Sequence, residues 1–163
     1  LKHFNLWLKF SMKKSIDGNI TVRPFNNDLY DNDFEIYHEL RNKIFPFQSN
    51  YCPVISLEER RFNAPGKFDP HYTYFVMDNE KEVGFIMAYI YEKQLILKTI
   101  GLLEEYRGRN LSRLLLKPIH EQAKKDKIST AIYAMVRVGN KVYKNKHPLA
   151  KEFRHYVTMR RKF

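Results

Sequence analysis

The segment KTIGLLEEYRGRNLSRLLL, residues 98–116, holds the residues whose types and spacing are best suited to chemistry. A strand-like apolar run ends at two glutamates, a turn with two arginines and a glycine follows, and a leucine-rich helical pattern begins at once. A helix N-terminus projects unpaired N–H groups and about half a positive charge. Glycine lets the backbone approach a ligand closely, and an arginine guanidinium can donate two hydrogen bonds to phosphate oxygens.

The junction therefore predicts a cradle for a diphosphate, with an ordinary capped helix start as the competing interpretation. The residues of this predicted cradle are Arg107, Gly108, Arg109, Asn110, Leu111 and Ser112. Neither the Gly-x-Gly-x-x-Gly dinucleotide fingerprint nor the Gly-Lys-Ser/Thr phosphate loop occurs here.

The net charge of the chain, like the predicted cradle, favours an anionic ligand. The chain has 29 Lys and Arg against 18 Asp and Glu, a formal net charge of +11. Such an excess favours polyanions or phosphorylated ligands and works against polycationic substrates. A solvated basic surface explains the charge equally well.

Hydrophobic periodicity predicts the elements that must position this junction. Strand-like runs occupy 19–25, 72–78, 82–91, 94–103 and 128–136, with a further strand or two in 152–163. Helical patterns begin at Asp31 or Asn32 and end before Pro46, begin at Ser56 with Glu59 in capping-box spacing, span 110–126, and start again near Asn140. Pro118 is expected to bend the 110–126 helix without ending it.

This order predicts an α+β fold, in which a mixed, mostly antiparallel central sheet is flanked by helices on both faces. Short polar turns at 79–81 and 92–93 imply an antiparallel meander, and the later strand–helix–strand order demands a parallel crossover. The 163 residues fit a single domain over 1–163, with 1–18 as an N-terminal extension.

Cysteine content and hydropathy indicate the cellular compartment in which we expect the protein. The one cysteine, Cys52, excludes an internal disulfide, and no Cys/His cluster has zinc spacing, so no metal is expected. No window approaches the 18 apolar residues of a membrane span. We expect a cytoplasmic protein, either a monomer or a homodimer.

The phrase LLEEYRGRNLSRLLL resembles the acyl-coenzyme A signature of the GNAT acyltransferase superfamily, Arg/Gln-x-x-Gly-x-Gly/Ala after a strand. The element order from residue 19 onward is similar too. Two positions depart from the pattern, because Asn110 and Ser112 stand where the family has its glycine and its second small residue. Asparagine tolerates positive φ and caps helices, and serine is small and donates hydrogen bonds.

The resemblance implies an N-acetyltransferase fold and an acetyl-CoA co-substrate. It implies that the diphosphate rests on the backbone amides of residues 107–112. It also implies that the pantetheine arm pairs like an added strand with Ile100, Gly101 and Leu102, in a gap between splayed strands. Gly101 would suit the bend of that splay, and the amide of Leu102 would polarise the thioester carbonyl. Asn140 matches a cofactor-contacting asparagine of the family.

The sequence leaves alternatives for the catalytic acid and assigns no catalytic base. The family often places a tyrosine acid seven residues after that asparagine, where this chain has His147; Tyr143 lies three residues after it, and both are candidates for the acid. No general base is convincing, although His38 and Glu39 on the first helix could reach the site or relay through water.

The acceptor implied is a primary amine of a small molecule or a protein. By resemblance its site includes residues 63–75, with Tyr72 and Tyr74, and the C-terminal segment. A non-enzymatic basic domain that binds nucleic acid through its arginines, and a family member that has lost catalysis, are the alternatives.

Overall fold

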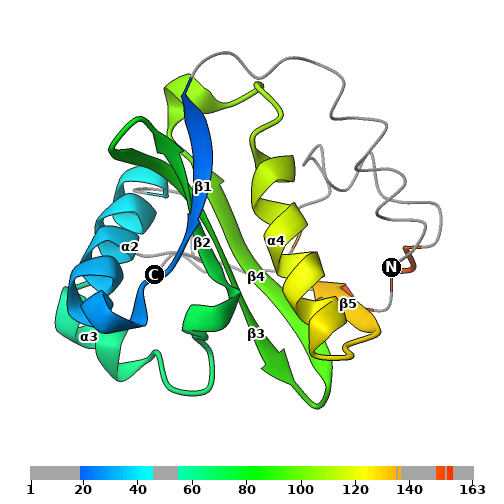
Figure 1. Ribbon diagram of the computed structural model, residues 1–163. Helices are drawn as coiled ribbons and strands as arrows, with labels where there is room; N and C mark the ends of the chain where they lie inside the picture. Colours follow the sequence, from blue (N-terminus) through cyan, green and yellow to red (C-terminus); the bar gives the residue numbers. More distant parts are fainter. Residues whose placement is uncertain (1–18, 46–54, 135, 137–149, 153, 156–163) are drawn as a thin grey trace, which may run out of the picture.

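The computed structural model describes residues 19–45, 55–134, 136, 150–152 and 154–155 of the chain. Within these residues the centre is a sheet in the order β1-β2-β3-β4-β5 (Figure 1). The strands are β1 (Ile20–Pro24), β2 (Thr73–Asp78), β3 (Lys81–Tyr91), β4 (Gln94–Leu102) and β5 (Thr130–Tyr133). Neighbours from β1 to β4 are antiparallel, and β5 is parallel to β4.

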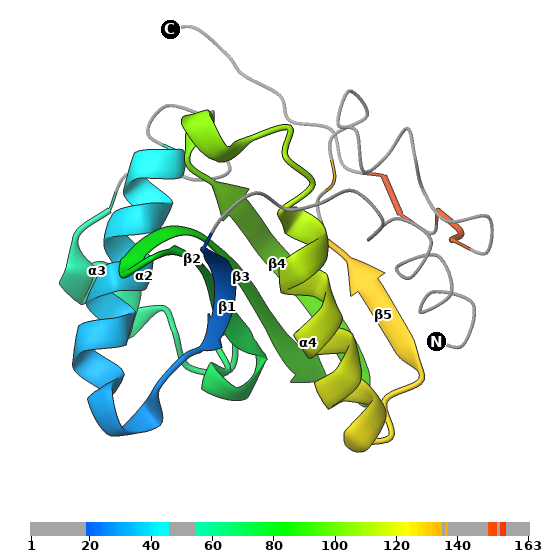
Figure 2. The ribbon, with the colours of Figure 1, turned by 45° about the horizontal axis from the view of Figure 1, so that its top comes forward.

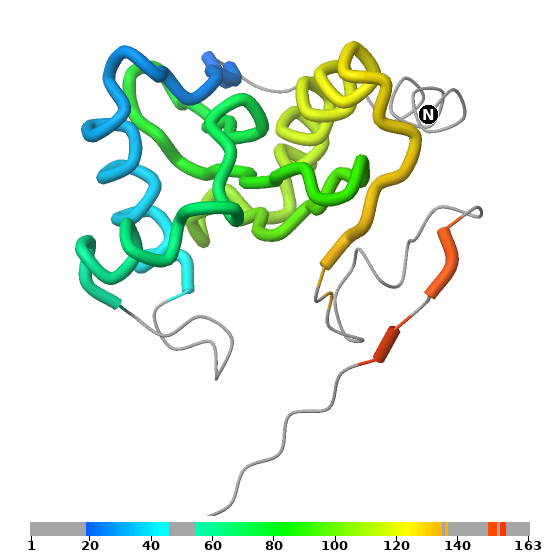
Figure 3. The backbone as a smooth tube through the Cα atoms, turned by 90° about the horizontal axis from the view of Figure 1, so that it is seen from below, coloured from blue at the N-terminus to red at the C-terminus, as the bar shows by residue number. Residues whose placement is uncertain are grey.

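Helices cover both faces of this sheet, as the sequence predicts. The α-helices are α2 (Tyr30–Ile44), α3 (Leu57–Phe62) and α4 (Ser112–Lys125). Single 3-10 turns, η1 (Asn27–Leu29), η3 (Pro70–Tyr72) and η4 (Glu104–Tyr106), connect them to the strands. Figure 3 shows β2, β3 and β4, in green, between α2 on one side and α4 on the other.

Alternation along the strands divides the core into two clusters. Phe75 and Phe85 point to one face and pack with α2, whereas Val76 and Ile86 point to the other and pack with α4. The α4 side is completed by Leu111, Leu115, Ile119 and Ala123, an i, i+4 stripe whose members are at most 1% exposed. The central strands β2 and β3 are therefore buried on both faces, whereas β5 is mostly exposed.

The start of α2 differs from the prediction, which placed its cap at Asp31 or Asn32. The chain becomes helical earlier, because the side chain of Asn26 accepts a hydrogen bond from the Asp28 amide and starts η1. Asp31 lies in the first turn of α2 and pairs with Arg61 of α3 at 3.0 Å. The predicted cap of α3 is confirmed, since Ser56 Oγ accepts from the Glu59 amide at 3.1 Å.

Two other helix predictions have different outcomes. Helix α4 continues through Pro118 to Lys125, as expected, although it begins at Ser112 and not at Asn110. The predicted helix near Asn140 lies outside the described residues, as does most of the segment 152–163.

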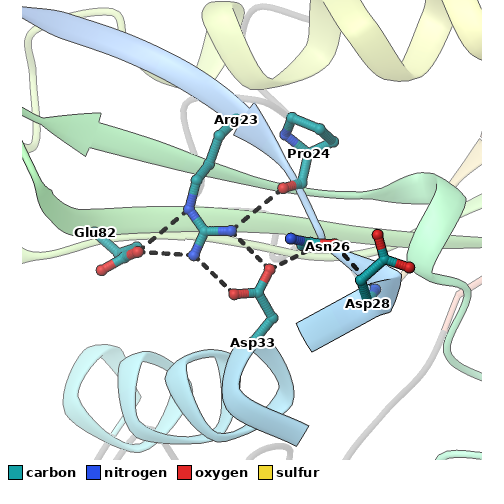
Figure 4. A network of polar contacts seen from close by, with 6 residues as sticks. All are labelled: Arg23, Pro24, Asn26, Asp28, Asp33 and Glu82. Atoms are coloured by element: carbon teal, nitrogen blue, oxygen red, sulfur yellow. Dashed lines mark hydrogen bonds and ion pairs between the residues drawn. The ribbon is translucent and has the colours of Figure 1, made fainter. Parts of the chain in front are cut away.

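One ion-pair network ties β1, α2 and β3 together at the edge of the α2 face (Figure 4). Arg23 on β1 donates to both oxygens of Asp33, at 2.6 and 3.0 Å, and to Glu82 Oε1 at 2.7 Å. Asp33 is 2% exposed and also accepts from the Asn26 amide at 2.7 Å. A buried carboxylate is stable only with such partners, so this network fixes where α2 begins on the sheet.

We predict that Asp33→Ala lowers the free energy of unfolding by about 3 kcal/mol. The substitution leaves the partly buried Arg23 with Glu82 as its one remaining ion-pair partner in this network. Lys43→Ala is the matched control: it breaks the exposed Lys43–Glu39 pair at 2.8 Å and should change stability by less than about 0.5 kcal/mol. Urea denaturation measures both. Similar losses in the two variants would show that the Arg23 network has no special stabilising role.

A second prediction concerns pH. His120 on α4 is 3% exposed, and burial lowers its pKa from 6.5 to about 4. As the pH falls through 6.5, His120 is protonated in the unfolded chain but stays neutral in the folded chain. The contribution of neutral His120 to the free energy of unfolding is therefore full above pH 6.5 and decreases as the pH falls. Between pH 7 and pH 5 the loss should be about 2 kcal/mol. His120→Gln should lose correspondingly less in urea melts at the two pH values, and an unchanged difference would contradict this assignment.

Candidate functional site

Strand β4 has a strand neighbour along its whole length on one side only. It pairs with β3 from Gln94 to Leu102, but among the described residues β5 pairs with just Gln94 to Leu97. The last recorded contact on that side is Ala134 N donating to Leu97 O at 3.1 Å. Figure 2 shows β5 at the edge of the sheet, beside the first part of β4. Among the described residues, β4 thus has no strand partner on that side from Thr99 to Leu102, and we call these residues the open edge.

A β-bulge lies where this open edge begins. Met87 of β3 is opposite Thr99 and Ala88 is opposite Leu97, so Lys98 is the extra residue in β4. Bulges increase strand twist and locally bend the strand, so we expect β4 to bend at this point.

The bulge does not fall at Gly101, where the sequence suggested a bend. Gly101 remains in register opposite Phe85. A Cβ on Gly101 would lie 2.8 Å from Ile44 Cγ2 and 3.1 Å from the Phe45 ring. A glycine is therefore needed here, because the end of α2 packs closely against β4.

Strand alternation shows which backbone groups face the open edge. Leu103 N donates to Val83 O at 2.9 Å, so the amide of Leu103 points toward β3, whereas its carbonyl accepts from the Tyr106 amide. N–H and C=O groups of alternate residues point to alternate sides of a strand. Those of Ile100 and Leu102 consequently point away from β3, toward the open edge.

The turn after β4 contains a run of backbone amides that are not bonded to other groups of the described protein. Residue φ values are +82° at Gly108 and +61° at Asn110, so the predicted tolerance of asparagine for positive φ is confirmed. The amides of 108–112, from Gly108 to Ser112, have no hydrogen-bond acceptor recorded in the described part of the chain. Hydrogen bonding of the helix begins with the next two amides. Arg113 N donates to Asn110 O at 3.1 Å, and Leu114 N donates to Leu111 O at 3.0 Å. We call residues 108–112 the amide loop.

Arg107 differs from the other residues of the predicted cradle. Its amide already donates to Glu104 O at 3.1 Å, closing η4. Its side chain turns back, placing Nε 3.1 Å from Leu102 O and Nη2 3.5 Å from Ile44 O. Neither the amide nor the guanidinium of Arg107 points into the amide loop.

Arg109 supplies the positive charge beside the loop. Its guanidinium lies 5.2 Å from the centre of the Tyr106 ring, in cation–π geometry. The Tyr106 hydroxyl in turn donates to Asp78 Oδ2 at 2.7 Å, and this bond raises the pKa of Tyr106. Asp78 at the end of β2 thereby anchors the loop. Tyr106 and Asp78 were not found from the sequence, because 28 residues separate them and no local pattern links them.

The chemistry of the amide loop is that of an anion site. Five consecutive N–H groups, the N-terminal end of the α4 dipole and an exposed arginine all favour negative charge. Among the described residues, no group of three His, Cys, Asp or Glu side chains could hold a metal ion.

The candidate bases are engaged elsewhere. His38 Nδ1 accepts from Arg60 Nε at 3.0 Å, and burial followed by the Arg60 charge lowers the pKa of His38. Glu39 pairs with Lys43, which lowers the pKa of that carboxyl. Neither contact brings these residues to the amide loop. The candidate acids Tyr143 and His147, and Asn140, lie outside the described residues.

The two tyrosines expected near the acceptor lie toward the other end of α4. Tyr72 is 2% exposed, and its hydroxyl donates to Asp126, the residue after α4; burial and this bond raise the pKa of Tyr72. Burial also raises the pKa of Tyr74, which packs on the α4-side core. A 14-residue helix is about 20 Å long, so Tyr72 lies far from the amide loop.

Comparison with known proteins agrees with this geometry. The family model described as the acetyltransferase (GNAT) family matches residues 34–145. The chain therefore belongs to the GNAT family of acetyltransferases. A comparison of the sequence with curated proteins gives no match.

Solved structures share the fold at low identity. A GCN5-related N-acetyltransferase from Sphaerobacter thermophilus matches with TM-score 0.59 and 17% identity over 69% of this chain, which spans 34% of that protein. The aminoglycoside N-acetyltransferase AAC(6')-Iy, in complex with CoA, matches with TM-score 0.57 and 14% identity over 90% of this chain and 97% of its own. The ribosomal-protein-S18-alanine N-acetyltransferase from Escherichia coli matches with TM-score 0.53 and 16% identity, over 72% and 69%. Among the described residues, no helix is long and apolar enough to cross a membrane.

We predict that the left-handed conformation of Asn110 reverses the usual order of alanine and glycine. Asn110→Ala should be about 1 kcal/mol less stable than Asn110→Gly, because a Cβ disfavours positive φ. At the exposed helical position Glu121 the order should invert, with Gly about 1 kcal/mol less stable than Ala. Denaturant melts of the four variants test this, and the same order at both positions would mean that residue 110 is not left-handed in solution.

Proposed function

We propose that this protein is an N-acetyltransferase that transfers the acetyl group of acetyl-CoA to a primary amine. The observation that carries the proposal is a run of five amides at the start of α4 that have no hydrogen-bond partner among the described residues. This run lies directly after the open edge of β4. Family membership supports the reaction class. The cofactor residues proposed from the sequence keep their roles, except that Arg107 does not contribute its amide and that the Leu102 amide does not polarise the thioester carbonyl.

The diphosphate of the coenzyme would bind the amide loop. Gly108, Arg109, Asn110, Leu111 and Ser112 present N–H groups there, and Arg109 adds a fixed positive charge held by Tyr106. A diphosphate carries the negative charge that this helix end favours.

The pantetheine arm would add to the open edge as a short strand. Its two amides can pair with the backbone of Ile100 and Leu102, the mode by which extended peptides add to a sheet edge. The arm then leads from the amide loop toward the bulge at Lys98, where the reactive thioester would lie.

The reaction needs three contributions. A backbone N–H of β4 close to the thioester, and not that of Leu102 beside the amide loop, would polarise the thioester carbonyl as the neutral amine attacks the carbonyl carbon. The C–N bond forms, the C–S bond breaks, and the amine proton leaves to water or an unassigned base. Tyr143, or else His147, would protonate the departing thiolate.

The acceptor is proposed only as a class, a primary amine of a small molecule or a protein. Structurally similar proteins include enzymes of both kinds, since AAC(6')-Iy is an aminoglycoside acetyltransferase and the Escherichia coli enzyme is a ribosomal-protein-S18-alanine N-acetyltransferase. The net charge of +11 makes an acceptor that carries negative charge more favourable than a polyamine.

Thermal stability in the presence of ligands tests the proposal. Acetyl-CoA at a hundred times its Kd should stabilise the protein by about 2.7 kcal/mol. Arg109→Glu should weaken coenzyme affinity at least about tenfold, because it places a like charge beside the diphosphate. Lys124→Glu is the matched control, the same charge change near the far end of α4, and should leave the affinity unchanged.

Duplex DNA and tRNA at two salt concentrations complete the experiment. Stabilisation by nucleic acid alone, falling steeply with salt, would replace the proposal with the nucleic-acid-binding alternative. Coenzyme binding with no acetylation across an amine library would indicate a family member that has lost catalysis.

A further inference from the structure

The guanidinium of Arg107 occupies the open edge of β4. Its Nε lies 3.1 Å from Leu102 O, and its Nη2 lies 3.5 Å from Ile44 O at the C-terminal end of α2. Both partners are backbone carbonyls, so the side chain makes no ion pair in these contacts. A charged donor on a carbonyl forms a stronger hydrogen bond than a neutral one.

Leu102 O is the last strand carbonyl of β4, because η4 begins two residues later, at Glu104. A segment that adds to the open edge next to the amide loop needs this acceptor for its first N–H. Arg107 Nε already donates to it. The edge is therefore open to a new strand at Ile100 but capped at Leu102 by the protein's own side chain.

We propose that Arg107 is a positioning residue that competes with the pantetheine arm for the Leu102 carbonyl, and so makes the site selective for intact coenzyme over phosphate-free pantetheine. This inference rests on the proposed function. An arm that pairs with Leu102 displaces the guanidinium, and the displaced charge lies next to the amide loop. A ligand with a diphosphate compensates for the lost hydrogen bond by pairing with that charge. Pantetheine alone does not.

The neighbouring arginine provides the contrast. Arg109 lies over the Tyr106 ring and makes no recorded contact with the β4 backbone. Its charge serves the amide loop without capping the edge. The two arginines should thus affect a phosphate-free ligand in different ways.

The test measures the dissociation constants of pantetheine and of CoA for the wild type, R107M, R107Q and R109M. Calorimetry serves for CoA, and saturation-transfer NMR serves for pantetheine, which we expect to bind weakly. Methionine keeps the length of the side chain and removes the donor, whereas glutamine keeps a donor that can reach a carbonyl. Arg107 is exposed, and circular dichroism melts verify that each variant folds.

R107M should bind pantetheine about three- to tenfold more tightly than the wild type, the effect of one competing hydrogen bond, and should bind CoA more weakly. The pantetheine affinity of R107Q should lie between those of the wild type and R107M. R109M should leave pantetheine unchanged and weaken CoA. A merely structural Arg107 would instead weaken both ligands in R107M.

The outcomes separate the two proposals. If the wild type binds CoA but R107M shows unchanged or weaker pantetheine binding, the competition is refuted and the proposed function stands. If the wild type binds neither ligand, the proposed function fails and the role of Arg107 fails with it.

Discussion

The change in hydrogen bonding along β4 is the constraint on which the candidate site depends. A strand has two edges, and β4 uses one edge for β3 along its full length. On the other edge its recorded pairing with β5 ends at Leu97, and the bulge at Lys98 follows at once. Within the described part of the chain, the backbone groups of β4 beyond this point have no strand partner, and we propose that a ligand uses them. Because an exposed sheet edge pairs readily with added strands, its position next to the amide loop has a chemical consequence.

The amide loop depends on backbone conformation more than on side chains. Positive φ at Gly108 and Asn110 prevents the helix from starting earlier, so five amides remain outside the hydrogen bonding of α4. Asparagine adopts this conformation more readily than most residues, which explains how the chain departs from the family signature and keeps the turn. The contact from Asp78 to Tyr106, and the Arg109 charge over that ring, hold the loop against the end of β2.

The α2 side of the sheet serves a different purpose. Arg23, Asp33 and Glu82 tie three elements together, and His38 is part of the hydrogen bonding between α2 and α3. These polar groups hold the helices in place and do not point to the amide loop. The close approach of Ile44 to Gly101 brings the end of α2 to β4, and Arg107 reaches both. The two halves of the fold thus meet at Leu102.

The sequence by itself determined the order of elements, the helices on both faces, the turn that becomes the amide loop and the tolerance of Asn110 for positive φ. All of these follow from local rules: hydrophobic period, capping and backbone preference. Only the tertiary structure decided that the bulge lies at Lys98, that Gly101 makes room for α2, that Tyr72 bonds Asp126 and that Arg107 turns to Leu102 O. Each of these depends on residues distant in the chain or on a choice among several nearby acceptors. Local sequence does not encode such choices, because packing of the whole chain sets which groups come within hydrogen-bonding distance.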